Sequence, residues 1–422
     1  MANLKKLKLA SSCVSCTTKP CQIGCPLNND ITGFIKEIKQ KNYHQAFDIL
    51  SKTTILMPIC GRVCPHHKQC EGSCVKGISY KPVKIGLLEA TIGDLALDKK
   101  WTFTSPKKTI KKVAVIGSGP AGLTCAAFLR MNGIGVTIYE KHDYLGGLLS
   151  HGIPEFRLPS KIVKKVITNI ISLGIDVKYN MELGQNLKLS TLKKEYDAIF
   201  LGIGANVSNR INVPGEELKN VYTGNELLEN KISLDYQNKF VIIYGAGNVA
   251  MDLSRTAKLN GAKKVLIIYR HTEQKMSADE KEIIAAKKDG IEFLYSTKII
   301  KINGQNELES VEVIKTKEII KDNQNILIDI ENSNYHISCD YFITAIGSHP
   351  DPLVEKLPLD KNQGKIIINN LGMTSNKKIF SGGDVAGWFC GEGLYGRLWL
   401  HFQGGHLFQA DARREGAGGP ID

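Results

Sequence analysis

The chain has 422 residues, of which 42% are hydrophobic and 23% are charged, and it contains 40 glycines. This composition is typical of a globular protein with two or three domains, and it excludes a disordered chain, a collagen and a coiled coil. No apolar run approaches the ~18 residues of a membrane helix, and the lysines of residues 1–10 precede no apolar signal stretch. We therefore expect a cytoplasmic protein with no membrane segment.

Almost all of the basic excess lies near the N-terminus. Residues 1–112 contain 19 Lys or Arg side chains against seven Asp or Glu, a net charge of +12, whereas the other 310 residues carry only +1. Such a block can attract nucleic acid, an acidic protein surface or an anionic inorganic centre, although most of its lysines are expected to form a solvated surface. Aromatic residues are too thinly interleaved for base stacking. We therefore expect no nucleic-acid ligand.

Eight of the eleven cysteines form two groups within this basic region. The first group has the spacing C-x2-C-x4-C-x3-C and ends on Pro26, and the second has the spacing C-x3-C-x5-C-x3-C. The members are Cys13, Cys16, Cys21 and Cys25, followed by Cys60, Cys64, Cys70 and Cys74. Between the groups, apolar residues recur at helical spacing, which predicts two short amphipathic helices that bring the cysteine loops together. The apolar stripes are Ile31, Phe34, Ile35 and Ile38, then Ala46, Phe47 and Leu50.

Thiols in this pattern indicate a metal centre. Structural zinc sites usually have two separated C-x2-C pairs or a Cys/His mixture, whereas a crowded run that closes on Cys-Pro is typical of bacterial ferredoxins, in which the fourth cysteine serves a second cluster. Iron–sulfur is therefore favoured over zinc, and both are favoured over metal-free cysteines. A zinc site would recruit His66 and His67, but their loop also holds Pro65 and Lys68, which favours solvated imidazoles.

Residues 111–140 predict a strand, a glycine turn, a helix and a second strand. Gly117, Gly119 and Gly122 form G-x-G-x-x-G, in which the first glycine permits the turn, the second lets the backbone approach a pyrophosphate and the third allows close helix packing. Pro120 and Ala121 complete the motif. Glu140 ends the second strand, 18 residues after Gly122, where a carboxylate accepts hydrogen bonds from ribose hydroxyls. Together these features predict a dinucleotide site.

A second copy of this pattern lies at residues 240–271. Its loop reads G-x-G-x-x-A, with Gly245, Gly247, Asn248 and Ala250 as the candidate contacts. The following strand ends in Arg270 and His271 and has no carboxylate at that point. A guanidinium suits a ribose 2′-phosphate, which a carboxylate would repel. We therefore expect NADPH, with NADH as the alternative, and Arg255 on the intervening helix either assists or is a surface arginine.

The segment from Cys13 to Cys74 resembles the small subunit of NADPH-dependent glutamate synthase and the N-terminal, electron-input part of dihydropyrimidine dehydrogenase. The resemblance implies two 4Fe-4S clusters with a crossed ligand arrangement: Cys13, Cys16, Cys21 and Cys74 on one, and Cys25, Cys64 and Cys70 on the other. It supplies a Glu or Gln as the eighth ligand, for which this chain offers Glu89, whereas the residue pattern alone favours an exposed helix glutamate there. Cys60 is left over and is expected to be a buried small hydrophobe.

The resemblance also implies that FAD occupies the first dinucleotide site and NADPH the second. Several glycine-rich segments are expected to return the chain to the flavin domain at the ends of its strands, with Asp384 contacting the ribityl or pyrophosphate of FAD, a role compatible with that of a helix N-cap. The flavin residues implied in this way are Gly147, Arg157, Gly204, Gly347, Gly383 and Asp384. Residues 221–338 contain no cysteine, so electrons cannot leave through a redox disulfide there.

We predict an α/β protein with a small α-helical iron–sulfur domain followed by two Rossmann-like domains, each with a doubly wound, mostly parallel sheet. The predicted boundaries are 1–105 for the iron–sulfur domain, 106–220 and 339–386 for the FAD domain, and 221–338 for the NAD(P)H domain. Residues 379–422 hold no lysine but 11 of the 40 glycines. Residues 387–422 are therefore expected to be an atypical tail, from a shifted reading frame or a foreign origin, where the resemblance ends and FAD binding comes into doubt.

The function that follows is electron input. NADPH passes a hydride to FAD N5, and the flavin releases electrons singly through two 4Fe-4S clusters to an acceptor subunit, which in glutamate synthase is the large subunit. The rival acceptor is a pyrimidine-reducing subunit. A rival of another class is an inactive scaffold or a zinc-binding interaction protein. The sequence contains no hydrolase triad and no paired carboxylates, so we predict no catalytic side chain.

Overall fold

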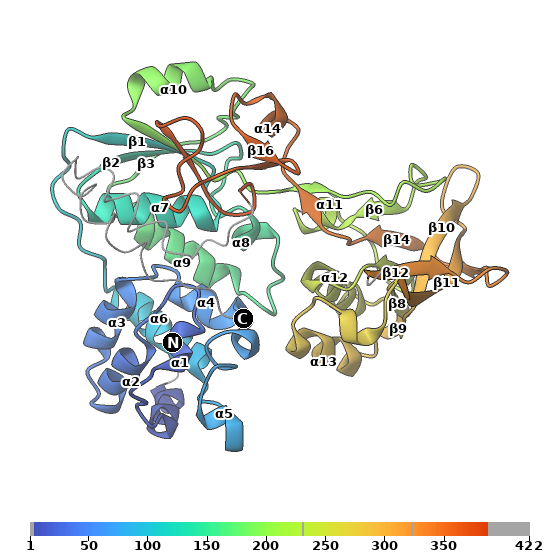
Figure 1. The fold of residues 1–422 in the computed structure, drawn as a ribbon, viewed down its shortest axis with the longest axis horizontal. Coiled ribbons are helices and arrows are strands. Elements are labelled where there is room, and N and C mark those ends of the chain that lie inside the picture. Colours follow the sequence, from blue (N-terminus) through green and yellow to red (C-terminus); the bar gives the residue numbers. More distant parts are fainter. Residues whose placement is uncertain (1–3, 230–231, 322–323, 387–422) are drawn as a thin grey trace. The chain divides into compact units, whose positions relative to one another are not determined.

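The computed structural model describes residues 4–229, 232–321 and 324–386 (Figure 1). The chain divides into two compact units. Unit 1 combines Met1–Ser150, Arg157–Gly204 and Pro352–Asp422, and unit 2 combines His151–Phe156 with Ala205–Asp351. The predicted NAD(P)H domain lies inside unit 2, which begins earlier and ends later in the chain. In the described part of the chain, no helix is long and apolar enough to span a bilayer.

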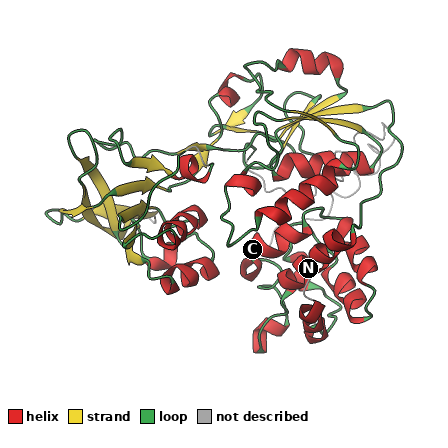
Figure 2. Cartoon of the chain, turned by 180° about the vertical axis from the view of Figure 1, so that it is seen from behind, coloured by secondary structure: helices red, strands yellow, loops and turns green. Residues whose placement is uncertain are grey.

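Short helices form the cysteine-rich part of unit 1 (Figure 2). The predicted amphipathic helices are both present, and their apolar stripes are buried, with Phe34 and Leu50 fully inaccessible. The Asp30 carboxylate begins the first of them by accepting a hydrogen bond from the backbone N–H of Gly33, which satisfies one of the unpaired donors of that helix end. The elements are η1 (Leu4–Ser12), α1 (Pro20–Ile23), α2 (Ile31–Lys39), α3 (Tyr43–Ser51), α4 (Met57–Val63), η2 (His66–Lys68), α5 (Lys76–Ser79) and α6 (Ile85–Lys99).

Helices α4 and α6 pack against each other at a distance that only glycine allows. A Cβ atom on Gly61 of α4 would stand 2.4 Å from the backbone nitrogen of Ala90, and a Cβ atom on Gly93 of α6 would stand 2.7 Å from the ring of Pro58. Arg62 ties the same two helices by donating a hydrogen bond of 2.7 Å to Asp94. The backbones of α4 and α6 therefore approach each other closely at these glycines.

The rest of unit 1 is built on a parallel sheet of order β18-β4-β1-β2-β3. Figures 1 and 2 place α10 on one face of this sheet and α7 with α9 on the other, as in a doubly wound fold. The central strand is apolar throughout Val113–Ile116 because both of its faces are covered. The elements are β1 (Lys112–Ile116), α7 (Pro120–Met131), β2 (Gly135–Tyr139), α8 (Leu148–His151), α9 (Ser160–Ile171), β3 (Asp176–Lys178), α10 (Leu189–Glu195), β4 (Ala198–Leu201), α14 (Leu353–Lys356), β16 (Lys361–Asn362), β17 (Lys365–Ile366) and β18 (Ile379–Ser381).

Unit 2 has a second parallel sheet, of order β6-β14-β7-β8-β9. Its main elements are β6 (Val221–Thr223), α11 (Gly224–Leu228), β7 (Phe240–Tyr244), α12 (Asn248–Leu259), β8 (Lys264–Ile268), η3 (Glu273–Lys275), α13 (Glu280–Lys288), β9 (Glu292–Leu294) and β14 (Tyr341–Thr344). An antiparallel sheet and a short two-stranded pair complete it: β10 (Thr297–Asn303), β11 (Ser310–Lys321), β12 (Gln324–Asp329) and β13 (Tyr335–Ser338), then β5 (Val207–Ser208) and β15 (Ser348–His349).

Within the described residues, helices cover only one face of the parallel sheet of unit 2. Val241 and Ile243 of β7 pack with α12 and α13, whereas Ile242 of the same strand packs with Ile299 and Val311 of the antiparallel sheet. The predicted fold of a helical domain followed by two Rossmann-like units is confirmed. Unit 2 differs from the doubly wound pattern in this one respect, because apolar strands rather than a helix cover the second face.

Candidate functional site

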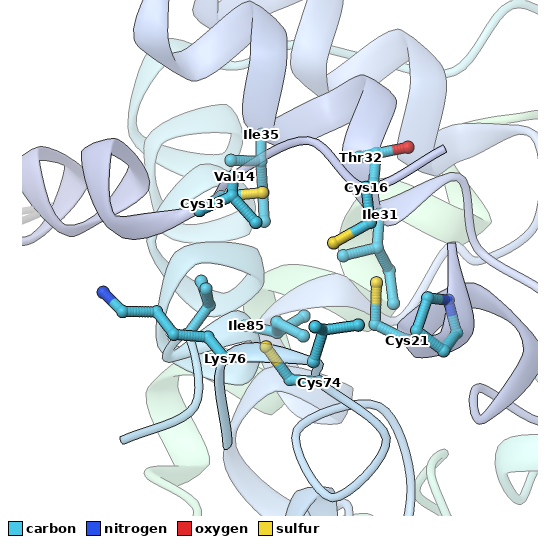
Figure 3. Close-up of a pocket in the computed structure, with 13 residues that line it drawn as sticks. Cys13, Val14, Cys16, Cys21, Ile31, Thr32, Ile35, Cys74, Lys76 and Ile85 are labelled. Atoms are coloured by element: carbon cyan, nitrogen blue, oxygen red, sulfur yellow. The ribbon is translucent and has the colours of Figure 1, made fainter. Parts of the chain in front are cut away.

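Four of the predicted cluster ligands surround one cavity in unit 1. Cys13 and Cys16 come from the loop before α1, Cys21 comes from α1, and Cys74 comes from the turn before α5. Figure 3 shows the four side chains around a common space, with apolar residues of α2 and the start of α6 beside them. Burial, together with the nearby Cys74 and Cys13 thiolates, raises the pKa of Cys21 to about 11. Thiolates in this cavity therefore require a compensating positive charge, which an iron–sulfur centre supplies.

The remaining cysteines gather in a second group with Glu89. The thiols of Cys25 and Cys70 have pKa values raised by burial, and the carboxyl group of Glu89 lies near enough to both to raise them further. The hydrogen bond from Cys64 to Cys60 and the burial of Cys60 raise the pKa of Cys60, although the Thr54 hydroxyl, 3.9 Å away, acts in the opposite direction. Cys60 therefore lies beside the predicted ligands.

Glu89 is not the exposed helix glutamate that the residue pattern favours. Its side chain is 5% exposed, and burial raises its pKa to about 8. Within the described residues its Oε1 atom has no hydrogen-bond partner. Glu89 is buried because it precedes Ala90 in α6, at the point where α6 packs closely against α4. A buried acceptor left without a partner costs about 1–3 kcal/mol, so a cationic centre among the cysteines fits this position.

His66 also differs from expectation. It is 5% exposed rather than solvated, because its ring packs under Gly86 at the start of α6, and its Nδ1 atom lies 3.6 Å from Cys70 Sγ. Across residues 4–229, 232–321 and 324–386, no three His, Cys, Asp or Glu side chains converge as a single ion requires. A 4Fe-4S cluster differs in that its four protein ligands bind four separate irons.

The first glycine motif forms an open cradle after β1. Gly117 has a φ of +93°, and a Cβ atom there would stand 2.5 Å from the carbonyl oxygen of Gly202. A Cβ atom on Gly122 would stand 2.0 Å from the carbonyl oxygen of Gly117, whereas one on Gly119 would meet no atom of the described residues within 4 Å. The space beside Gly119 faces the first turn of α7, which begins with Pro120 and Ala121. It is therefore shaped for a phosphate group.

The other predicted flavin residues of unit 1 follow neighbouring strands at the same edge of the sheet. Glu140 follows β2 and is buried, and its carboxylate accepts hydrogen bonds from the N–H and hydroxyl of Ser118 and from the N–H of His142. Gly204 follows β4, and Asp384 follows β18, where its side chain is exposed. Ligands of open parallel sheets bind at this edge, beside the strand where the order reverses.

The other three predicted flavin residues of unit 1 are Gly147, Gly383 and Arg157. Gly147 packs against the Gly119 backbone, with its Cβ position 3.1 Å from Gly119 Cα, and Gly383 has a φ of +78° in the turn after β18. Arg157 is half-buried where the chain re-enters unit 1. The helix that Asp384 was expected to cap, and the predicted tail at 387–422, lie outside the described residues.

A cavity of about 560 Å³ lies at the corresponding edge of the sheet in unit 2. Gly245, with a φ of +132°, lies against the end of β14, since a Cβ atom there would stand 2.1 Å from the carbonyl oxygen of Ala345. Asn248 lines the cavity at the start of α12, and Ala250 is fully buried behind it. The other lining residues include Gly247, Arg270, His271 and Gly347.

One arginine named from the sequence does not line this cavity, and another arginine does. Arg255 does not line this cavity; it pairs with Glu282 at 2.9 Å and Asp289 at 2.8 Å and stacks on the ring of Phe156. Arg210 does line the cavity. In the sequence it is marked only as a basic residue that follows the short strand β5. Gly347 was expected in the flavin domain but lies in unit 2, because β14 is paired between β6 and β7.

These features define a class of protein: an oxidoreductase with two dinucleotide sites and a cysteine-lined helical domain. Residues 111–406 match the family model described as pyridine nucleotide-disulphide oxidoreductase, and residues 2–101 match that of dihydropyrimidine dehydrogenase domain II, 4Fe-4S cluster. The first match ends at residue 406 rather than near residue 386, where the sequence pattern predicts the end of the resemblance.

Known proteins resemble most of the chain. The glutamate synthase [NADPH] small chain of Escherichia coli strain K12 is 32% identical over 403 residues, which cover 89% of this chain and 85% of the relative. The NAD-dependent dihydropyrimidine dehydrogenase subunit PreT of Salmonella typhimurium strain LT2 is 30% identical and covers 90% of this chain and 89% of its own length. The fold of FprA from Mycobacterium tuberculosis, solved with NADPH, is similar, with a TM-score of 0.59 at 16% identity over 69% of this chain and 86% of FprA.

The chain therefore belongs to the pyridine nucleotide-disulphide oxidoreductase family, in the branch that includes the glutamate synthase small chain. This membership confirms the predicted class, an NAD(P)H-dependent flavin oxidoreductase with a 4Fe-4S domain. It carries FAD and NAD(P) sites and an iron–sulfur domain. The individual ligands and contacts named above stay predictions.

Proposed function

We propose that this chain is the electron-input subunit of a two-component enzyme. It oxidises NADPH at the cavity of unit 2, holds FAD at the glycine cradle of unit 1, and delivers electrons through two 4Fe-4S clusters to a separate acceptor subunit. The nicotinamide, the flavin and the clusters supply the redox chemistry when bound. The residues of the chain bind these groups, orient them and compensate their charge.

The cysteine-rich domain carries the proposal most strongly. Four thiols, three from residues 13–21 and one from Cys74, surround one cavity. A second group of thiols lies beside a buried carboxyl group whose Oε1 atom has no protein partner among the described residues. A flavin reductase that served only a small acceptor would need neither group. The net charge of +12 in residues 1–112 also suits an acidic partner surface and partly offsets the negative charge of the clusters.

The acceptor is the glutamate-forming large subunit in the leading form of this proposal. The relative named glutamate synthase small chain supports it, with 85% of its length covered. The relative named dihydropyrimidine dehydrogenase subunit PreT, with 89% covered, favours a pyrimidine-reducing partner as the second candidate. Co-purification of each candidate partner with the native chain separates the two.

Anaerobic reduction tests the electron-input function. We expect the full chain, purified without oxygen, to contain about eight iron and eight sulfide atoms, and its flavin absorbance to bleach on addition of NADPH much faster than on addition of NADH. Stoichiometric zinc without iron would instead support the interaction protein. Equal bleaching rates with NADPH and NADH would remove the argument from Arg270.

Replacing Glu89 by alanine tests its place at the second cluster. We expect Glu89→Ala to change the electron paramagnetic resonance signal of one cluster and to leave that of the other unchanged, because only the second cysteine group adjoins this carboxyl group. Cys60→Ser is the matched control, since Cys60 lies in the same group but is the predicted spare thiol. A changed signal in Cys60→Ser with an unchanged one in Glu89→Ala would exchange their roles.

A further inference from the structure

Three hydrogen-bonded side chains, Glu318, His271 and Arg270, connect the antiparallel sheet of unit 2 with the nucleotide cavity. Arg270 Nε lies 3.2 Å from His271 Nε2, and His271 Nδ1 lies 2.8 Å from a carboxylate oxygen of Glu318. The other oxygen of Glu318 pairs with Lys275 at 2.6 Å. Arg270 and His271 line the cavity, whereas Glu318 belongs to β11.

The hydrogen bonds among these three side chains have only one consistent set of donors and acceptors. A guanidinium has no acceptor, so Arg270 Nε must donate and His271 Nε2 must accept. The imidazole proton is then on Nδ1, which donates to Glu318. His271 therefore contributes no second positive charge towards the cavity in this arrangement. The hydrogen bond from Nε to His271 holds the Arg270 guanidinium in place. The two terminal nitrogens of Arg270 take no part in that hydrogen bond and can form a bidentate interaction with an oxyanion.

The backbone of the same segment is fixed by the strands that follow it. The Thr316 hydroxyl donates to the carbonyl oxygen of Arg270 at 2.6 Å, and the Ser296 N–H donates to the carbonyl oxygen of His271 at 3.0 Å. The Lys275–Glu318 pair and the hydrogen bond from His271 lower the pKa of Glu318, so its carboxylate stays ionised. The antiparallel sheet thus supports both the backbone and the side chain of the arginine.

We propose that His271, which is hydrogen-bonded to both Arg270 and Glu318, is a positioning residue that sets the preference for a 2′-phosphorylated nucleotide by orienting the Arg270 guanidinium. This inference rests on the proposed NADPH specificity and deepens it. Ordering a long arginine side chain costs conformational entropy, and a side chain that is already held loses less of it on binding. His271 then affects nucleotides that carry a 2′-phosphate and has no effect on those that lack one.

Calorimetric titration of the oxidised, FAD-loaded full chain with NADP⁺ and NAD⁺ tests this. We expect Arg270→Gln to weaken NADP⁺ binding about tenfold or more and to leave NAD⁺ binding unchanged. His271→Phe keeps a ring beside Tyr269 but removes both nitrogens, and we expect it to weaken NADP⁺ binding roughly three- to tenfold. His271→Gln, which restores an acceptor, should recover most of the loss. His336→Phe, an exposed histidine of β13 outside the cavity, is the matched control.

The double variant separates positioning from direct contact. If His271 acts through Arg270, adding His271→Phe to Arg270→Gln produces no further loss of NADP⁺ affinity. Independent losses in the double variant would mean that His271 touches the phosphate itself and would overturn the inference. An unchanged NADP⁺ affinity in His271→Phe, with a large loss in Arg270→Gln, would overturn it while leaving the NADPH preference intact. If Arg270→Gln changes neither nucleotide, the NADPH preference fails as well.

Discussion

Alanine at position 119 is expected to weaken flavin binding strongly in a chain that still folds. Gly119 has ordinary backbone angles, φ −64° and ψ −178°, and a Cβ atom there meets no atom of residues 4–229, 232–321 or 324–386 within 4 Å. The substitution should therefore cost less than about 1 kcal/mol of stability. The new methyl group would occupy the space into which a pyrophosphate must come, and we expect FAD affinity to fall roughly 10–100-fold. Flavin content after purification and the dissociation constant for added FAD measure the effect.

Gly247→Ala is the reciprocal variant. Its Cβ atom would meet only the Ser277 hydroxyl, at 3.4 Å, so it too should fold. We expect it to retain flavin and to lose affinity for NADP⁺. The opposite result, a colourless Gly247→Ala and a yellow Gly119→Ala protein, would reverse the order of the two nucleotides. Gly122→Ala should behave differently from both, because its Cβ atom would lie 2.0 Å from a backbone oxygen and destabilise the unit by about 1–3 kcal/mol.

Serine at position 74 is expected to remove one of two clusters. Cys74 lines the same cavity as Cys13, Cys16 and Cys21, although it lies 49 residues beyond the last cysteine of the first group. A hydroxyl is a much poorer iron ligand than a thiolate. Cys74→Ser should therefore retain about half of the iron and sulfide, and it should lose the resonance signal that Glu89→Ala leaves unchanged.

Cys60→Ser provides the comparison for this result. Both changes replace a thiol by a hydroxyl in the same sequence group, but only Cys74 lines the first cavity. We expect Cys60→Ser to keep its full iron content. Loss of all iron in Cys74→Ser would mean that the domain cannot fold around a single cluster. Retention of all iron would contradict the crossed ligand arrangement, because Cys25 or another group would then complete the first cluster.

The elements that the sequence predicts well are those whose signal is local. The apolar stripe of α2 at i, i+3, i+4 and i+7 identifies both the helix and its buried face, since helical side-chain directions repeat every 3.6 residues. Both glycine motifs can also be predicted from the sequence, because the positive φ of Gly117 and Gly245 and the missing side chain of Gly119 depend on single residues.

The residues that the sequence misplaces depend on contacts between distant segments. His66 and Glu89 look like exposed residues in their own segments, yet the ring of His66 packs under Gly86 of α6, and Glu89 is enclosed where α6 packs closely on α4. Arg255 is expected either to assist at the nucleotide site or to be a surface arginine, yet two carboxylates of later segments engage it and it does not line the cavity. In each case the contacting residue is far away in the sequence, so no local repeat of residue types predicts the contact.

By itself the sequence determined the helical domain, the two nucleotide folds and the residue types that line them, because backbone conformation and amphipathic pattern are encoded over a few neighbouring residues. The tertiary structure alone decided that Glu89 is buried beside the second cysteine group and that Glu318, 47 residues after His271, reaches the end of β8. Burial and hydrogen bonding between distant segments depend on how closely helices and sheets pack, and packing is settled only when the whole core forms.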